Sequence, residues 1–187
     1  ERGAGMTVAV DEALAAVEKR SPLVNAITNN VTINDVAQII LHWGGLPVMC
    51  DDEREVTDMI ASAQSCLLNM GTVSEAGEST MMTAGEAANA QGVPIVLDPV
   101  GVGGTPTRTR VANRLASELD IAIIKGNYGE VTALADRDAE VRGVESVGTY
   151  SEIAATAIAC ARKYETVVVA SGETDIVATG KRAHEVT

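Results

Sequence analysis

The chain contains the stretch Ile95-Val96-Leu97-Asp98-Pro99-Val100-Gly101-Val102-Gly103-Gly104, in which an apolar run leads directly into a glycine-rich loop. An apolar run without alternation predicts a parallel strand covered on both faces, and such sheets bind ligands at the carboxyl ends of their strands. Glycines let backbone N–H groups approach phosphate oxygens, whereas a neighbouring carboxylate repels phosphate unless a cation intervenes. Asp98 therefore indicates Mg²⁺ beside a phosphate-bearing ligand. The alternative is that Asp98 caps the next turn and that the glycines only shape it.

Helical and strand patterns alternate outward from this stretch. Strands are predicted at residues 23–27, 46–49, 66–69, 95–97, 121–124 and 166–170. Helices are predicted at 8–19, 32–42, 53–63, 75–89, 107–118 and 151–164, with a short one after Asn127 and a loop at 136–149. Residues 175–179 and 182–186 alternate as a hairpin does. Repeated βα units predict one α/β domain over residues 1–187, with a mostly parallel sheet and helices on both faces.

Composition excludes several classes of protein. The chain is 46% hydrophobic and 21% charged, which suits a globular core. Aromatic residues make up 2% with no Phe, and the net charge is −12. Because base-stacking platforms are scarce and an acidic surface repels phosphate backbones, we expect neither nucleic acid nor an anionic membrane as a partner. No apolar stretch approaches the length of about 18 residues that suggests a membrane span.

The cysteines indicate a reducing compartment. Cys50, Cys66 and Cys160 have no CxxC spacing, and the last two lie inside apolar segments. We therefore expect a cytoplasmic protein in which cysteines are small buried hydrophobes.

Six predicted strands end in small or polar residues, and parallel strands bring these ends to one rim. The ends are Thr28-Asn29-Asn30, Met49, Asn69-Met70-Gly71-Thr72, Asp98, Lys125-Gly126-Asn127 and Ser171-Gly172-Glu173. A single end such as Asn69 is explained well enough as a turn residue. The six together favour a binding site.

Phosphoryl transfer needs a metal, donors for developing charge and a base. Asp98 and Glu130 can hold Mg²⁺ through water, and Lys125 can contact phosphate. Each also has a structural explanation, since Lys125 can be a solvated surface residue and Glu130 lies in a first helical turn, where the dipole favours an acid.

Five segments follow one another along nearly the whole chain: Ser21-Pro22-Leu23-Val24-Asn25-Ala26-Ile27-Thr28-Asn29, Gly45-Leu46-Pro47-Val48-Met49, Leu68-Asn69-Met70-Gly71-Thr72, Val96-Leu97-Asp98-Pro99-Val100-Gly101-Val102-Gly103 and Ile124-Lys125-Gly126-Asn127 with Glu130. In these segments and their collinear order the chain resembles the hydroxyethylthiazole kinase family of thiamine biosynthesis. The resemblance implies a three-layer, ribokinase-like α/β/α fold. It also implies a homotrimer with sites at subunit interfaces, and transfer of the ATP γ-phosphate to the hydroxyl of 4-methyl-5-(2-hydroxyethyl)thiazole.

Site roles follow from the same resemblance. Met49, Asn29 and Gly71 are expected at the thiazole, and Asp98 and Glu130 at Mg²⁺. ATP is expected near Lys125, Asn127 and Ser171. Lys125 stands where the family usually has an arginine, and Ser171 where it usually has a threonine. A lysine acts only as a point charge, so we expect weaker ATP binding than an arginine would give.

The family's Gly-Thr-Gly-Cys segment, which supplies the anion hole and the cysteine base, is expected beyond residues 182–186 and is absent from this sequence. No catalytic base is therefore assigned within the chain. Cys50 is a candidate substitute, but its different strand end favours a buried, inert thiol.

We expect a fragment that lacks the C-terminal part of the kinase domain. The alternatives are a natural short form that binds thiazole or thiamine without turnover, and a related ribokinase-like kinase of another small alcohol.

Overall fold

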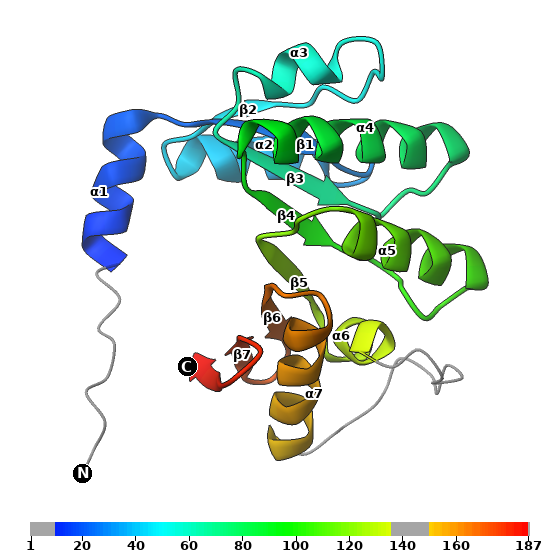
Figure 1. Cartoon of the computed structure of the whole chain (residues 1–187). Coiled ribbons are helices and arrows are strands. Elements are labelled where there is room, and N and C mark those ends of the chain that lie inside the picture. Colours follow the sequence, from blue (N-terminus) through cyan, green and yellow to red (C-terminus); the bar gives the residue numbers. More distant parts are fainter. Residues whose placement is uncertain (1–9, 136–149, 187) are drawn as a thin grey trace.

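The computed structural model describes residues 10–135 and 150–186 (Figure 1). The strands are β1 (Leu23–Ile27), β2 (Leu46–Val48), β3 (Ser65–Asn69), β4 (Ile95–Asp98), β5 (Ile123–Asn127), β6 (Val167–Ser171), β7 (Asp175–Ala178) and β8 (Ala183–Val186). The helices are α1 (Val10–Arg20), α2 (Ile33–His42), α3 (Val56–Ile60), α4 (Glu75–Gln91), α5 (Pro106–Glu118), α6 (Tyr128–Ala135) and α7 (Tyr150–Lys163). The first residues of the helix expected at 8–19 and the loop expected at 136–149 lie outside the described residues.

The eight strands form one sheet in the order β2-β1-β3-β4-β5-β6-β7-β8. Pairings from β2 through to β6 are all parallel, and β7 and β8 add an antiparallel hairpin at the edge. The parallel sheet and the terminal hairpin predicted from the sequence are both confirmed.

The two faces of the sheet are covered unequally by the described residues. Crossovers are right-handed, so the step from β1 to β2, which runs opposite to the others, places α2 on the face opposite α3, α4 and α5. Figure 1 shows α4 and α5 side by side over the sheet. Leu68, Leu97 and Ile124 are fully buried and paired in register, which makes them the centre of the core.

Two elements differ from expectation by three residues or more at one or both ends. The helix expected at 53–63 is only α3, because Asp52 accepts a hydrogen bond from the Arg54 N–H at 2.9 Å and holds a turn there. Strand β5 continues to Asn127 rather than ending at Ile124, because Lys125 and Asn127 pair with Val169 and Ser171 of β6. Pairing with a neighbouring strand outweighs the local polar sequence.

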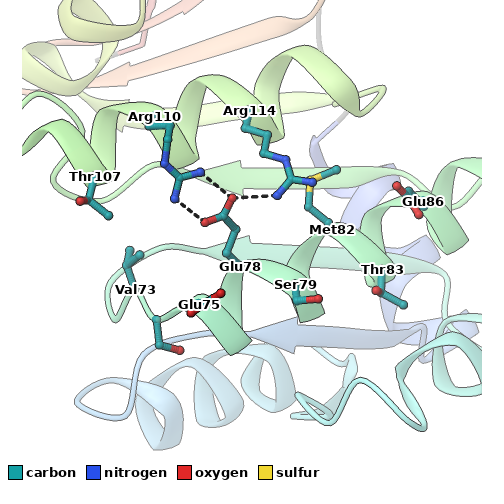
Figure 2. Close-up of a pocket in the computed structure, with 11 residues that line it drawn as sticks. Val73, Glu75, Glu78, Ser79, Met82, Thr83, Glu86, Thr107, Arg110 and Arg114 are labelled. Carbon is teal, nitrogen blue, oxygen red and sulfur yellow. Dashed lines mark hydrogen bonds and ion pairs between the residues drawn. The ribbon is translucent and has the colours of Figure 1, made fainter.

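An ion-pair cluster joins α4 to α5. Figure 2 shows Glu78 on α4 pointing toward Arg110 and Arg114 on α5, at 2.7 and 2.8 Å. The cluster lines a cavity of about 850 Å³ between the two helices. These hydrogen bonds lower the pKa of Glu78 to about 2. Nothing in the sequence pattern singled out this contact.

Replacing Glu78 with Gln is expected to destabilise the fold at pH 7 by about 1–2 kcal/mol, a modest value because both arginines are half-exposed. A pKa lowered by folding gives stability that is present above the unfolded pKa near 4.5 and lost as the pH falls toward 2. Urea unfolding at pH 7 and pH 2.5 should therefore show the difference between wild type and variant shrinking in acid. Glu75→Gln on the same helix is the control, and an equal difference at both pH values would contradict the prediction.

Candidate functional site

The carboxyl ends of β1, β3 and β4 are joined by the side chain of Asn69. Its Nδ2 donates to Asp98 Oδ2 at 2.7 Å, and its Oδ1 accepts from Asn29 Nδ2 at 3.1 Å and from the Gly71 N–H at 2.9 Å. Three residues expected in the site are thus connected through one that sequence reasoning had explained as a turn former. The available signal was that Asn69 ends a strand immediately beside Asp98's strand.

The amide of Asn29 is fixed from both sides. Its Oδ1 accepts from the N–H groups of Val31 and Thr32 at 3.0 and 3.1 Å, just before α2. Gly71 packs against it so closely that an added Cβ would lie 2.4 Å from Asn29 Nδ2. Asn29 and Gly71 therefore lie in close contact.

Met49 directly follows β2, and the segment is held by Asn25 of β1. The Asn25 side chain is fully buried, donates to the Cys50 carbonyl at 3.3 Å and accepts from the Cys50 N–H at 3.2 Å. Strand β2 neighbours β1, so Met49 lies on the same rim as Asn29. No hydrogen bond links Met49 to Asn29 or Gly71 among the described residues, and Asn25 was not expected in the site.

Asp98 lies among charged groups at the end of β4. Burial raises the pKa of Asp98, and the negative charge of Glu130 raises it further, while Lys125 and the Asn69 hydrogen bond act in the opposite direction. The fold thus brings together Asp98, Glu130 and Lys125, as the sequence predicted.

Glu130 and Asn127 also have structural roles. Glu130 Oε2 accepts from the Asn127 N–H at 2.8 Å, while Asn127 Oδ1 accepts from the Glu130 N–H at 2.9 Å, which is a reciprocal cap at the start of α6. Glu130 Oε1 accepts from the Gly101 N–H at 2.9 Å and so ties the glycine loop to α6. The structural explanation for an acid at this position is correct, and the charge of the carboxylate also raises the pKa of Asp98.

The expected ATP side is built on β5 and β6. Ser171 Oγ donates to the Gly126 carbonyl at 3.3 Å across the two strands. The side chain of Lys125 is exposed and lies within β5 rather than after it. After β6, Gly172 packs on the ring of Tyr128, where an added Cβ would lie 2.4 Å from a ring carbon.

The donor set fits Mg²⁺ of the kind that binds together with phosphate. Among residues 10–135 and 150–186 no group of three His, Cys, Asp or Glu side chains can hold a metal. Mg²⁺ needs only one or two carboxylates when waters and phosphate oxygens complete its shell. Asp98 Oδ1 has no protein hydrogen-bond partner in the described part of the chain, so Asp98 can supply such a carboxylate, whereas both oxygens of Glu130 also accept backbone N–H bonds.

Each cysteine is buried, as expected. Burial raises the pKa of Cys50, raises that of Cys66 to about 12 and that of Cys160 to about 11. A raised pKa disfavours the thiolate, so the environment of Cys50 does not suit it as a base.

One further side chain at this rim was missed. Arg108 of α5 donates to the carbonyls of Met70, Gly71 and Val100 at 2.7, 3.0 and 2.8 Å. The sequence offered no signal for it beyond its place just after the glycine loop.

Thr28 Oγ1 at the end of β1 is buried without a hydrogen-bond partner among the described residues. Within those residues, no helix is both long and apolar enough to cross a membrane.

Comparison with known proteins gives a consistent result. The profile of the "Hydroxyethylthiazole kinase family" matches residues 14–187. Relatives named hydroxyethylthiazole kinase include one from Natronomonas pharaonis, 66% identical over 94% of this chain and 63% of its own length. Another, from Haloquadratum walsbyi, is 62% identical over 92% of this chain and 60% of its own length. The chain therefore spans about three fifths of the length of these relatives.

Solved structures agree on the fold. A hydroxyethylthiazole kinase protein from Pyrococcus horikoshii OT3 superposes with a TM-score of 0.85 at 38% identity, over 94% of this chain and 65% of that one. A ribokinase-like superfamily protein from Enterococcus faecalis gives 0.58 at 9% identity, over 88% of this chain and 62% of that one, which speaks for the fold alone. On the strength of the family match and the conserved architecture, this chain belongs to the hydroxyethylthiazole kinase family.

Proposed function

We propose that this chain carries the substrate and metal side of an enzyme that transfers the γ-phosphate of ATP to the hydroxyl of 4-methyl-5-(2-hydroxyethyl)thiazole, in the cytoplasm. Family membership supports this activity. The observation that carries the proposal is the hydrogen-bonded row Asn29–Asn69–Asp98, which places two side-chain amides beside the half-buried carboxylate of Asp98 at the strand ends.

The residues divide into two groups along this row. Met49, Asn29 and Gly71 face the thiazole, and the close Asn29–Gly71 contact fixes the shape of that side. Asp98 and Glu130 hold Mg²⁺, which when bound neutralises phosphate oxygens. Lys125 adds a positive charge near Asp98, while Asn127 and Ser171 shape the ATP side. No base for the substrate hydroxyl is assigned.

Calorimetry with hydroxyethylthiazole and with Mg²⁺-ATP tests the proposal on this chain. We expect hydroxyethylthiazole to bind. We expect ATP to bind when Mg²⁺ is present and not when Mg²⁺ is left out. Phosphate transfer is followed in the same samples. Binding without transfer would favour a thiazole-binding module, and a thiamine titration would then separate the two ligands. Absence of binding by both thiazole and Mg²⁺-ATP would contradict the proposal.

We also propose a homotrimer whose site takes residues from two chains. The support is an apolar surface around α2 and β2, where Val31 is 88% exposed, Ile39 59%, Trp43 56% and Leu46 49%. Permanent oligomers bury aliphatic surface of this kind. Ile33, the first residue of α2, is half-buried and therefore less available to such an interface than Val31.

Val31→Asp is expected to convert a threefold mass to a single-chain mass in sedimentation equilibrium, because a charge would be buried in the interface. Thiazole binding should fall with it, since the surface adjoins Asn29. Val186→Asp, at an exposed apolar site on β8, is the control. A wild-type monomer that still binds thiazole would overturn the shared-site proposal.

A further inference from the structure

Arg108 lies in the first turn of α5, yet its guanidinium bonds to two loops rather than to its own helix. Its Nη1 donates to the Met70 carbonyl at 2.7 Å and to the Val100 carbonyl at 2.8 Å, and its Nη2 donates to the Gly71 carbonyl at 3.0 Å. The first and last of these carbonyls belong to the loop after β3, and the second belongs to the loop after β4. One half-buried side chain therefore spans both loops.

The charge of Arg108 is in an unfavourable place for the helix. A cation in a first helical turn is opposed by the helix dipole. Arg110 and Arg114 on the same helix pair with Glu78, whereas Arg108 forms no ion pair with any residue that the structure describes. The favourable interactions of the Arg108 guanidinium are therefore its three hydrogen bonds to backbone carbonyls, and all three lie at the rim of the candidate site.

The peptide unit between Val100 and Gly101 is held at both ends. Its carbonyl accepts from Arg108, and its N–H donates to Glu130 Oε1 at 2.9 Å. A cation at the oxygen and an anion at the hydrogen match the peptide dipole and fix the plane of this peptide. Gly101 has φ +75, and an added Cβ there would lie 3.1 Å from Arg108 Cδ.

The hydrogen bonds of Arg108 link the glycine loop to the loop that contains Gly71. Arg108 connects the two loops on one side, while Asn69 connects Gly71 to Asp98 on the other. Lys could keep the charge, but a single ammonium cannot reproduce a planar fork that reaches three separated carbonyls.

We propose that Arg108 is a positioning residue that sets the spacing between the Gly71 loop and the Asp98–Gly101 loop, and thereby couples the two halves of the site. The identity of the ligands at the two halves, thiazole and Mg²⁺-phosphate, rests on the proposed function. The coupling of the loops does not depend on that identity.

Arg108→Lys tests the proposal by amide hydrogen exchange and by calorimetry on the same samples. We expect exchange of the Gly71 and Gly101 amides to become about tenfold faster together, and thiazole and Mg²⁺-ATP each to bind about tenfold more weakly, since several bonds to a charged donor are lost. Arg110→Lys is the matched control, because it makes the same change on the same helix but contacts Glu78. It should leave both loops and both affinities as in wild type.

The outcomes separate this proposal from the proposed function. If the amide of Gly71 or of Gly101 exchanges in Arg108→Lys at the wild-type rate, the positioning role is overturned. It is also overturned if both amides exchange faster while thiazole and Mg²⁺-ATP bind with wild-type affinity. If wild type binds neither thiazole nor Mg²⁺-ATP, the proposed function fails, and joint acceleration of the two amides still supports the coupling of the loops. Thermal unfolding shows that each variant is folded. Should Arg108→Lys not fold, Gly101→Ala displaces the same side chain and is judged by exchange at Gly71.

Discussion

Asp98→Asn is expected to reduce Mg²⁺-dependent phosphate transfer by about 10²–10³-fold, the range seen when one electrostatic group of an active site is removed. Binding of Mg²⁺-ATP should weaken, while thiazole binding stays near the wild-type value, because the proposed function places the lost charge at the metal and not at the thiazole. Calorimetry measures both affinities on this chain, and transfer is measured wherever wild type shows it.

The same substitution is expected to leave the free energy of unfolding unchanged or higher. Burial raises the pKa of Asp98, which means that the fold disfavours its charged form. Asparagine removes that charge and can still accept the hydrogen bond from Asn69 Nδ2. Loss of ligand affinity with retained stability distinguishes a functional residue from a structural one.

Asp120→Asn is the control for Asp98→Asn, because Asp120 is exposed and lies before β5, at the opposite end of the sheet. Wild-type affinity for Mg²⁺-ATP in Asp98→Asn would remove Asp98 from the metal site.

Gly71→Ala is expected to abolish measurable thiazole binding and to destabilise the fold by about 2–3 kcal/mol. The new Cβ would lie 2.4 Å from Asn29 Nδ2 and 2.7 Å from Asn29 Cβ. Asn29 cannot move aside without losing its bonds to Val31, Thr32 and Asn69. Urea unfolding and calorimetry give the two values.

A double-mutant cycle tests the cause of this effect. In an Asn29→Gly background the three Asn29 atoms nearest the added Cβ, which all belong to its side chain, are absent, so Gly71→Ala should cost much less stability than it does alone. Gly92→Ala is the matched control, because Gly92 has φ +69 with no atom within 4 Å of an added Cβ, so it should cost about 1 kcal/mol without affecting binding. Additive costs at Gly71 and Asn29 would show that the two residues do not act through contact.

The site was only partly predictable from single residues. Asp98, Asn29 and Gly71 were expected from strand ends and from the family resemblance, and the structure connects them through Asn69. Asn69 was given no role of its own because an Asn two residues before a glycine is explained equally well by a turn. Glu130 was placed correctly near Asp98, but its bond to Gly101 shows a second role that its helical position alone could not reveal.

Local patterns along the chain were enough to predict the order of the elements, the parallel sheet, the terminal hairpin and the strand ends that carry polar residues. These features follow from hydrophobic periodicity and glycine punctuation, which act within a few neighbouring residues. The length of β5, the Glu78 cluster and the three bonds of Arg108 were decided only by the tertiary structure. Asn69 is hydrogen-bonded to Asp98, which is 29 positions away in the sequence, and to Asn29, which is 40 positions away. The bond between Arg108 and Met70 joins residues that are 38 positions apart. Which donor meets which acceptor over such separations depends on how strands and helices pack, because many pairings satisfy the same local pattern and only one fits the assembled sheet.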